Sequence, residues 1–112
     1  MYEGMRIHPP AQILMVKRTP PKGDNVLGHH IPGGTKIAWN QFALMRDKEL
    51  FGDDAYLFRP ERWLAVDSEK RQEMERHVEL IFGYGKYICS GKQVALSSLN
   101  RIFVEVCLSC CA

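Results

Sequence analysis

The sequence of 112 residues has a net charge of +2, with 46% hydrophobic and 25% charged side chains, as is ordinary for a soluble globular domain. This charge gives no reason to expect a nucleic-acid partner. Of the four cysteines, Cys107, Cys110 and Cys111 crowd the carboxyl end and Cys89 stands apart, so a secreted disulfide framework is not expected.

The first predicted element is the end of a helix at residues 1–8, stopped by two prolines. Glu3 and Arg6 stand three positions apart, which places them on one helix face where they can form a charge-assisted pair. Glu73 and Arg76 repeat this spacing in a segment where a solvent-exposed face explains it. The spacing alone therefore does not establish a functional pair.

Two short strands are predicted next, at residues 11–18 and 36–39. The first is apolar and ends in Lys17 and Arg18 before two prolines, and the second follows a Pro-Gly-Gly turn. Residues 22–28 between them are mostly polar and are predicted to form a loop.

His29 and His30 follow this loop and raise the question of a metal site. Adjacent residues of a strand point to opposite faces, and no cluster of carboxylates accompanies the pair, so we expect both to be loop residues. A short helix is predicted at residues 41–45 and a turn at residues 51–54.

Residues 58–63 have the sequence Phe-Arg-Pro-Glu-Arg-Trp. On their own they are compatible with a surface turn held by two aromatic side chains. Asp67 follows and can cap a helix that has Glu69 in its first turn and runs toward Arg76. Because its residues are mainly charged, we expect this helix to be exposed.

Residues 82–91 form a glycine-punctuated stretch, Phe-Gly-Tyr-Gly-Lys-Tyr-Ile-Cys-Ser-Gly. Glycine permits positive φ and close approach of the backbone to a ligand, so a phosphate-binding loop has to be considered first. A dinucleotide-binding motif that starts at Gly83 and Gly85 would need its third glycine at position 88, which is Ile88. A phosphate-binding loop has four residues between its two glycines, whereas five residues separate Gly85 from Gly91. Neither nucleotide motif fits.

Cys89 is the residue of this stretch that can ligate a metal. A helix is predicted to begin near Lys92, and the partial positive charge of its N-terminus favours an anionic sulfur. A structural zinc site needs four ligands, and no second Cys or His stands at finger spacing from Cys89. Haem iron needs only one thiolate ligand from the protein. Such a thiolate pushes electron density toward oxygen bound to the iron and favours cleavage of its O–O bond.

The last predicted helix covers residues 92–109, where apolar residues recur every three or four positions. Cys107 and Cys110 share this spacing, so we expect them to pack in a core rather than to form a redox pair. The run Ile102–Leu108 is broken by Glu105 and is too short to span a bilayer. No membrane segment or signal peptide is therefore expected in this chain.

The pattern Phe82-x-x-Gly85-x-x-x-Cys89-x-Gly91 resembles the haem-binding signature of the cytochrome P-450 superfamily, the haem-thiolate monooxygenases. The resemblance implies that Cys89 is the axial iron ligand and that Phe82 packs beneath the haem. It also implies that Gly83, Gly85 and Gly91 let the loop lie against the porphyrin.

Tyr87 departs from the signature, because the family usually has an arginine there that binds a haem propionate. Tyrosine can donate a hydrogen bond but brings no charge, which Lys86 can supply instead. By the resemblance the first strand passes beside the haem, so Lys17 or Arg18 is a candidate propionate partner, with a solvated basic pair as the equal alternative. The same segment implies substrate contacts at Ala11, Gln12 and Ile13.

A second motif supports the resemblance. The sequence Glu3-x-x-Arg6, then Pro-Glu-Arg62, then the Cys89 loop occurs in the order found in the family. In the family, a Phe-x-Pro-Glu-Arg-Trp segment completes a buried network with the Glu and Arg of the K helix, the helix to which residues 1–8 correspond. The resemblance therefore implies that Arg62 joins Glu3 and Arg6 in a structural network.

The fold class implied is mainly α with short β strands (α+β), the C-terminal part of the family fold. Residues 1–112 then form a partial domain that runs from the K helix at 1–8 to the L helix at 92–109. We interpret the chain as a fragment or truncated product of such an enzyme. Its sequence is most similar to a fungal microsomal branch that includes pisatin demethylase.

A complete member of the family binds haem b, O2 and a small apolar substrate, and takes electrons from NADPH through a flavoprotein reductase. The resemblance implies these cofactors and partners, and it implies the cytoplasmic face of the endoplasmic reticulum membrane for a full-length relative. Lys86 and Lys92 are candidates for a basic rim that faces the reductase, with ordinary solvated lysines as the alternative.

Two hypotheses remain open. In the first, the chain holds haem through Cys89 and belongs functionally with the monooxygenases. In the second, it is a truncated, non-catalytic remnant that does not hold haem alone, because it would expose an apolar face made to meet other helices. Nucleotide binding is a third class, disfavoured by the glycine spacing.

Overall fold

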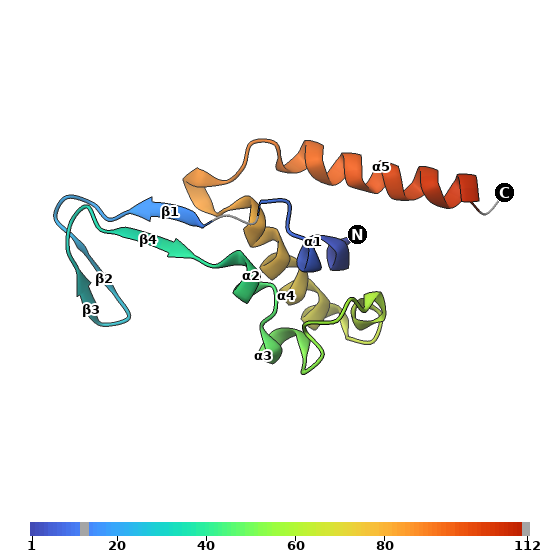
Figure 1. Ribbon diagram of the computed structural model, residues 1–112, viewed down its shortest axis with the longest axis horizontal. Coiled ribbons are helices and arrows are strands. Elements are labelled where there is room, and N and C mark those ends of the chain that lie inside the picture. Colours follow the sequence, from blue (N-terminus) through green and yellow to red (C-terminus); the bar gives the residue numbers. More distant parts are fainter. Residues whose placement is uncertain (12–13, 111–112) are drawn as a thin grey trace.

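The computed structural model describes residues 1–11 and 14–110. The predicted substrate contacts Gln12 and Ile13, and also Cys111, lie outside the described residues. The molecule is elongated, with extents of 61 × 31 × 23 Å. Figure 1 shows three parts: a central group of short helices, an arm of paired strands, and a long final helix that runs beside the central group.

Helices and 3-10 turns make up most of the described chain. In chain order they are α1 (Tyr2–Ile7), α2 (Gln41–Leu44), α3 (Lys48–Phe51), η1 (Pro60–Trp63), α4 (Ser68–Glu79), η2 (Leu80–Phe82), η3 (Gly85–Tyr87) and α5 (Lys92–Cys110). Together with four short strands they confirm the predicted fold class, mainly α with short β strands.

Side-chain caps mark where α3 and α4 begin. The Asp67 carboxylate accepts the amide of Lys70 at 2.8 Å, so α4 begins where the sequence predicted. Asp47 accepts the amide of Glu49 at 2.9 Å ahead of α3. Only a turn at 51–54 was predicted in this region, and the capping aspartate is the signal that was overlooked.

One apolar core lies between the central helices. Its buried members are Met5, Met45, Phe51, Ala55, Met74, Val78, Ile81 and Phe82. α4 therefore buries one face through Met74 and Val78 and exposes only its charged side, which corrects the prediction of an exposed helix. Phe82, the last residue of η2, lies in this core, so the core fixes the start of the glycine-rich loop.

The arm in Figure 1 begins with an antiparallel pair, β1 (Met15–Arg18) and β4 (Lys36–Trp39), in which Lys17 lies opposite Ile37. β4 matches its predicted range, and β1 lies in the second half of the predicted range 11–18. Side chains alternate along β1 between half-buried and exposed, so neighbouring residues of this strand face different surroundings.

A second hairpin, β2 (Asp24–Val26) and β3 (His29–Ile31), occupies the tip of the arm, where the sequence predicted a loop. Its two-residue turn has Leu27 at φ +51° and Gly28 at φ +82°, the positive values of a type I′ turn. Leucine is an unusual residue for such a turn, which is why the prediction of a loop was wrong. His29 and His30 are exposed strand residues.

α5 is the longest helix and begins at Lys92, as predicted, but it buries none of its residues. Ala95, Leu96 and Leu99 are partly buried against the core, whereas Cys107 and Cys110 are exposed free thiols. The prediction that these two cysteines pack in a core is therefore wrong for the described chain. None of the described helices combines the length and apolar character needed to cross a membrane.

Candidate functional site

Backbone hydrogen bonds close the glycine-rich loop between η2 and α5. The amide of Cys89 donates to the carbonyl oxygen of Phe82 at 2.7 Å, and that of Ile88 donates to Gly85 at 3.1 Å. Gly83 has φ +80°, and a Cβ there would come within 2.8 Å of the carbonyl oxygen of Tyr87. Glycine is therefore required at this position both for its backbone conformation and for space.

Cys89 is exposed at the end of this closed loop and is a free thiol. Its carbonyl oxygen accepts the amide of Lys92 at 3.2 Å, which joins the loop to the first turn of α5. The space beside Gly85 is open to 4 Å, and a Cβ on Gly91 would stand 3.7 Å from the Cys89 sulfur. An accessible thiol bordered by a glycine suits a broad, flat ligand such as haem.

Lys17 and Tyr87 come together across the loop and the first strand. The Lys17 ammonium lies 3.7 Å from the centre of the Tyr87 ring, and the Lys86 ammonium lies 5.0 Å from it. Arg18 is exposed and, as the next residue of β1, faces the other side of the strand. Of the two basic residues proposed at the end of β1, the structure brings Lys17 to the loop.

Glu3, Arg6 and Arg62 form one buried, hydrogen-bonded network. Arg6 binds both carboxylate oxygens of Glu3, at 2.7 Å through Nη2 and 2.9 Å through Nε, and Arg62 Nε donates to the same carboxylate at 3.1 Å. Trp63 Nε1 and the amide of Arg59 each add a hydrogen bond at 2.9 Å. The three charged side chains are at most 3% exposed, so solvent does not weaken these contacts.

The two guanidinium groups also hold backbone carbonyls that no helix or strand satisfies. Arg6 donates to Ala55 at 2.5 Å and to Leu57 at 3.0 Å. Arg62 donates to the carbonyl of Asp54 at 3.1 Å and to its carboxylate at 2.9 Å. Sequence reasoning missed Asp54 as a network member, because neither its spacing nor a motif connects it to Arg62.

Glu3 is charged in this setting although it is buried. Burial raises its pKa, but the hydrogen bonds from Arg6, from the Arg59 amide and from Trp63 outweigh that cost and lower the pKa to about 2. The carboxylate therefore acts as a fixed negative charge at every physiological pH. A group whose charge does not change suits a structural role better than proton transfer.

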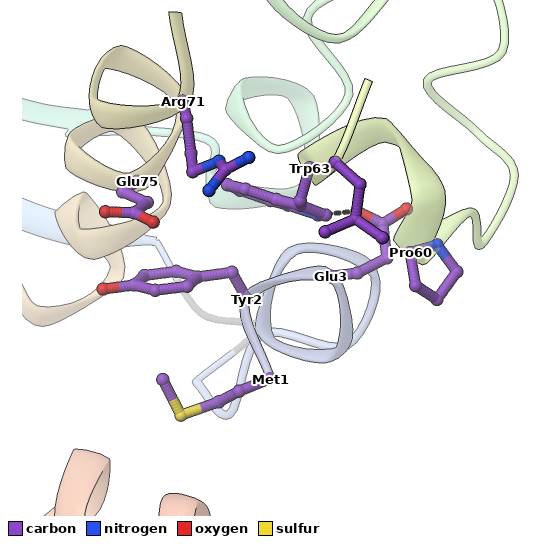
Figure 2. A pocket seen from close by; sticks show the side chains of 8 residues that line it. Met1, Tyr2, Glu3, Pro60, Trp63, Arg71 and Glu75 are labelled. Carbon is purple, nitrogen blue, oxygen red and sulfur yellow. Dashed lines mark hydrogen bonds between the residues drawn. The ribbon is translucent and has the colours of Figure 1, made fainter. Parts of the chain in front are cut away.

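Figure 2 shows an open pocket beside this network, in which the indole of Trp63 points to the Glu3 carboxylate. The rings of Tyr2 and Trp63 stack with centroids 5.4 Å apart. The pocket is lined by residues in and next to α1, η1 and α4. The lining includes none of residues 82–91, so this pocket is distinct from the Cys89 loop.

Metal ligation by a cluster of side chains is not supported. Within residues 1–11 and 14–110, no group of three or more His, Cys, Asp or Glu side chains could hold a metal ion. His29 and His30 therefore have no partners of the kind that a polydentate site needs. The single exposed thiol of Cys89 suits only a metal that brings most of its own ligands.

Comparison with known proteins agrees with the geometry of the loop. The family model for cytochrome P-450 matches residues 1–109. The chain is 48% identical over 106 residues to the cytochrome P-450 monooxygenase aba1 of Botryotinia fuckeliana, which covers 95% of this chain and 21% of that protein. It is 45% identical over 105 residues to abl1 of Leptosphaeria maculans, covering 94% of this chain and 18% of that protein.

A solved structure gives the same result. A zebrafish cytochrome P-450 determined with progesterone superposes with a TM-score of 0.64 at 30% identity, over 84% of this chain and 19% of that one. The chain thus spans about a fifth of the length of these relatives. Both curated relatives are fungal, as expected, whereas the finer similarity to pisatin demethylase stays a prediction. The chain belongs to the cytochrome P-450 family.

Proposed function

We propose that this chain provides the haem-thiolate loop of a monooxygenase, with Cys89 as the axial ligand of haem b. The observation that carries the proposal is the exposed Cys89 thiol on a loop closed by the hydrogen bond to Phe82. Gly91 borders that thiol without a side chain, and the space at the Cβ position of Gly85 is open. When bound, a haem with a thiolate ligand supplies the chemistry that inserts one oxygen atom of O2 into an organic substrate.

The other loop residues take supporting roles in this proposal. Phe82 is buried in the core and supports the loop from below, and Gly83 allows the turn that follows it. Lys17 and Tyr87 form the candidate propionate-binding pair, since Lys17 brings a positive charge to the position where the family usually has an arginine. Arg18 is the weaker candidate because it faces the other side of β1.

The substrate, electron donor and location are also part of the proposal. A small apolar molecule and O2 are the expected substrates, and NADPH is the expected electron source through a flavoprotein reductase. For the full-length protein we propose the cytoplasmic face of the endoplasmic reticulum membrane. Lys86 is exposed and suits a rim that faces an acidic reductase, whereas the Lys92 ammonium is engaged with Glu79 at 2.6 Å.

A second candidate is a chain that does not hold haem by itself. The observation in its favour is the large number of exposed apolar side chains on α5, including Ile102, Phe103 and Leu108. A chain of this kind would show no cooperative thermal transition. A cooperative transition of the chain without haem would count against it.

The test is the absorption difference spectrum of the haem-loaded, reduced protein with and without carbon monoxide. We expect a thiolate-type band that disappears in Cys89→Ser. Cys107→Ser is the matched control, because Cys107 is also an exposed free thiol but lies on α5 away from the loop. A band that persists in Cys89→Ser, or that disappears equally in Cys107→Ser, would reject Cys89 as the ligand.

A further inference from the structure

The first residue of α5 makes an ion pair that ties this helix to α4. Lys92 Nζ lies 2.6 Å from Glu79 Oε2, and the two side chains are 19% and 27% exposed. Within the described residues, this is the only side-chain hydrogen bond that joins α5 to another element. The remaining attachment of α5 is through apolar residues that are only partly buried.

The other oxygen of Glu79 extends the link to a third helix. Tyr2 donates its hydroxyl to Glu79 Oε1 at 2.9 Å, so one carboxylate joins α1, α4 and α5. Burial works against ionisation of Glu79, but the hydrogen bonds from Lys92 and Tyr2 outweigh it and lower its pKa. The carboxylate is therefore charged at neutral pH and holds both donors at once.

The same ion pair is close to Cys89 along the chain. Lys92 is three residues after Cys89, and its amide donates to the Cys89 carbonyl oxygen at 3.2 Å. On the other side, the amide of Cys89 is bound to Phe82, which lies in the core. The core thus fixes one end of the loop, and the ion pair from Glu79 fixes the other end.

We propose that Glu79 and Lys92 are positioning residues that hold the start of α5 and thereby orient the Cys89 thiolate toward its ligand. The inference rests on the proposed haem-thiolate function. It also assigns Lys92 a role different from the reductase-facing rim. An ammonium that is neutralised by a carboxylate and is 19% exposed contributes little to the attraction of a distant partner.

The experiment compares haem-loaded variants of the protein in the reduced, carbon monoxide-bound form. Glu79→Gln and Lys92→Met each remove the ion pair, while Lys92→Arg retains it. Glu73→Gln is the matched control, since Glu73 belongs to the same helix and forms a 2.9 Å ion pair with Lys70, but it is 54% exposed and its pair lies within α4. The first readout is the thiolate-type to thiolate-lost ratio, which is the absorption of haem that keeps the thiolate ligand divided by that of haem that has lost it. The second readout is the reduction potential of the haem.

We expect Glu79→Gln and Lys92→Met to lower the ratio of thiolate-type to thiolate-lost haem about 3- to 10-fold, the effect of losing one charge-assisted contact at a partly exposed site. The reduction potential should shift with the ratio. Lys92→Arg should restore both values, and Glu73→Gln should leave them unchanged. If Glu79→Gln does not fold, Lys92→Met still tests the proposal, because the bond between Tyr2 and Glu79 remains.

The outcomes separate this inference from the proposed function. If the band depends on Cys89 but Glu79→Gln and Lys92→Met have wild-type ratios and potentials, the function stands and the positioning role is rejected. A lower melting temperature with an unchanged ratio also rejects it, since the pair is then only structural. If the protein without these substitutions shows no band that depends on Cys89, the proposed function fails and this inference fails with it.

Discussion

The network around Glu3 and the loop around Cys89 use polar groups in opposite ways. In the network, Glu3, Arg6 and Arg62 are at most 3% exposed, and each is bound by several partners. In the loop, residues 84–90 are all exposed, and the backbone rather than the side chains makes the bonds. The charged side chains of the network hold distant parts of the chain together, whereas the loop keeps a thiol accessible to a ligand.

The largest expected effect is on the network. Arg62→Met should lower the free energy of unfolding by about 3–5 kcal/mol, because it leaves the buried Glu3 carboxylate short of a partner. Arg59→Met is the matched control: Arg59 also pairs with Asp54, at 2.6 Å, but its side chain is 51% exposed. Urea unfolding of both variants measures the difference.

The control variant Arg59→Met should unfold with wild-type stability within experimental error, since exposed pairs contribute little. Equal losses in the two variants would contradict the assignment of the network to the core. An unchanged midpoint in Arg62→Met would contradict it as well.

A smaller effect is expected from acid. Glu3 has a pKa of about 2 in the folded chain against an ordinary value of 4.5, so its stabilisation is complete above the ordinary value and is lost as the pH falls toward 2. Protonating this group should cost about 3 kcal/mol of folding free energy, because its pKa in the folded chain is about 2 and each tenfold change in proton affinity is worth 1.36 kcal/mol.

Carbon-detected NMR titration of the Glu3 carboxyl group measures this pKa directly. Unfolding experiments between pH 5 and pH 2.5 should show stability falling along with it. A titration midpoint near 4.5 would show that the contacts from Arg6 and Trp63 do not stabilise the charged form.

The smallest effect is expected in the loop. Gly83→Ala should cost about 1–3 kcal/mol, because Gly83 adopts a backbone conformation that is restricted to glycine and a Cβ would meet the Tyr87 carbonyl at 2.8 Å. Gly85→Ala is the control, since Gly85 has φ +60° but open space around its Cβ position. Thermal unfolding should rank Gly83→Ala below Gly85→Ala, and the reverse order would show that contact with Tyr87 is unimportant.

The sequence predicted those parts of the fold that have local signals. Asp67 marked the start of α4, and the spacing of apolar residues marked α5. The β2–β3 hairpin was missed because Leu27 occupies a turn position where Asn, Asp or Gly is the usual signal. The short helix α3 was missed because its capping residue, Asp47, was overlooked.

The site was predictable to the extent that motifs carry it. The motifs named Glu3, Arg6 and Arg62, and the structure brings these residues together. It also gives Trp63, the last residue of the same motif, a hydrogen bond to Glu3, and it adds Asp54, which is joined to them only in three dimensions. The contact between Lys17 and Tyr87 depends on the pairing of β1 with β4 and on the course of the loop. Contacts between residues far apart in the sequence leave no local pattern, so only the fold reveals them.

The guanidinium groups of Arg6 and Arg62 also constrain the order in which the chain folds. Residues 52–59 form no helix or strand. The carbonyl of Ala55 accepts from Arg6, about fifty positions earlier in the chain, and the carbonyl of Leu57 accepts from both Arg6 and Arg62. Closing a loop of that length costs entropy before any bond rewards it. The segment between α3 and η1 has turn hydrogen bonds of its own, from Ala55 to Gly52 and from Leu57 to Asp54, so we expect docking of α1 to complete its order rather than to create it.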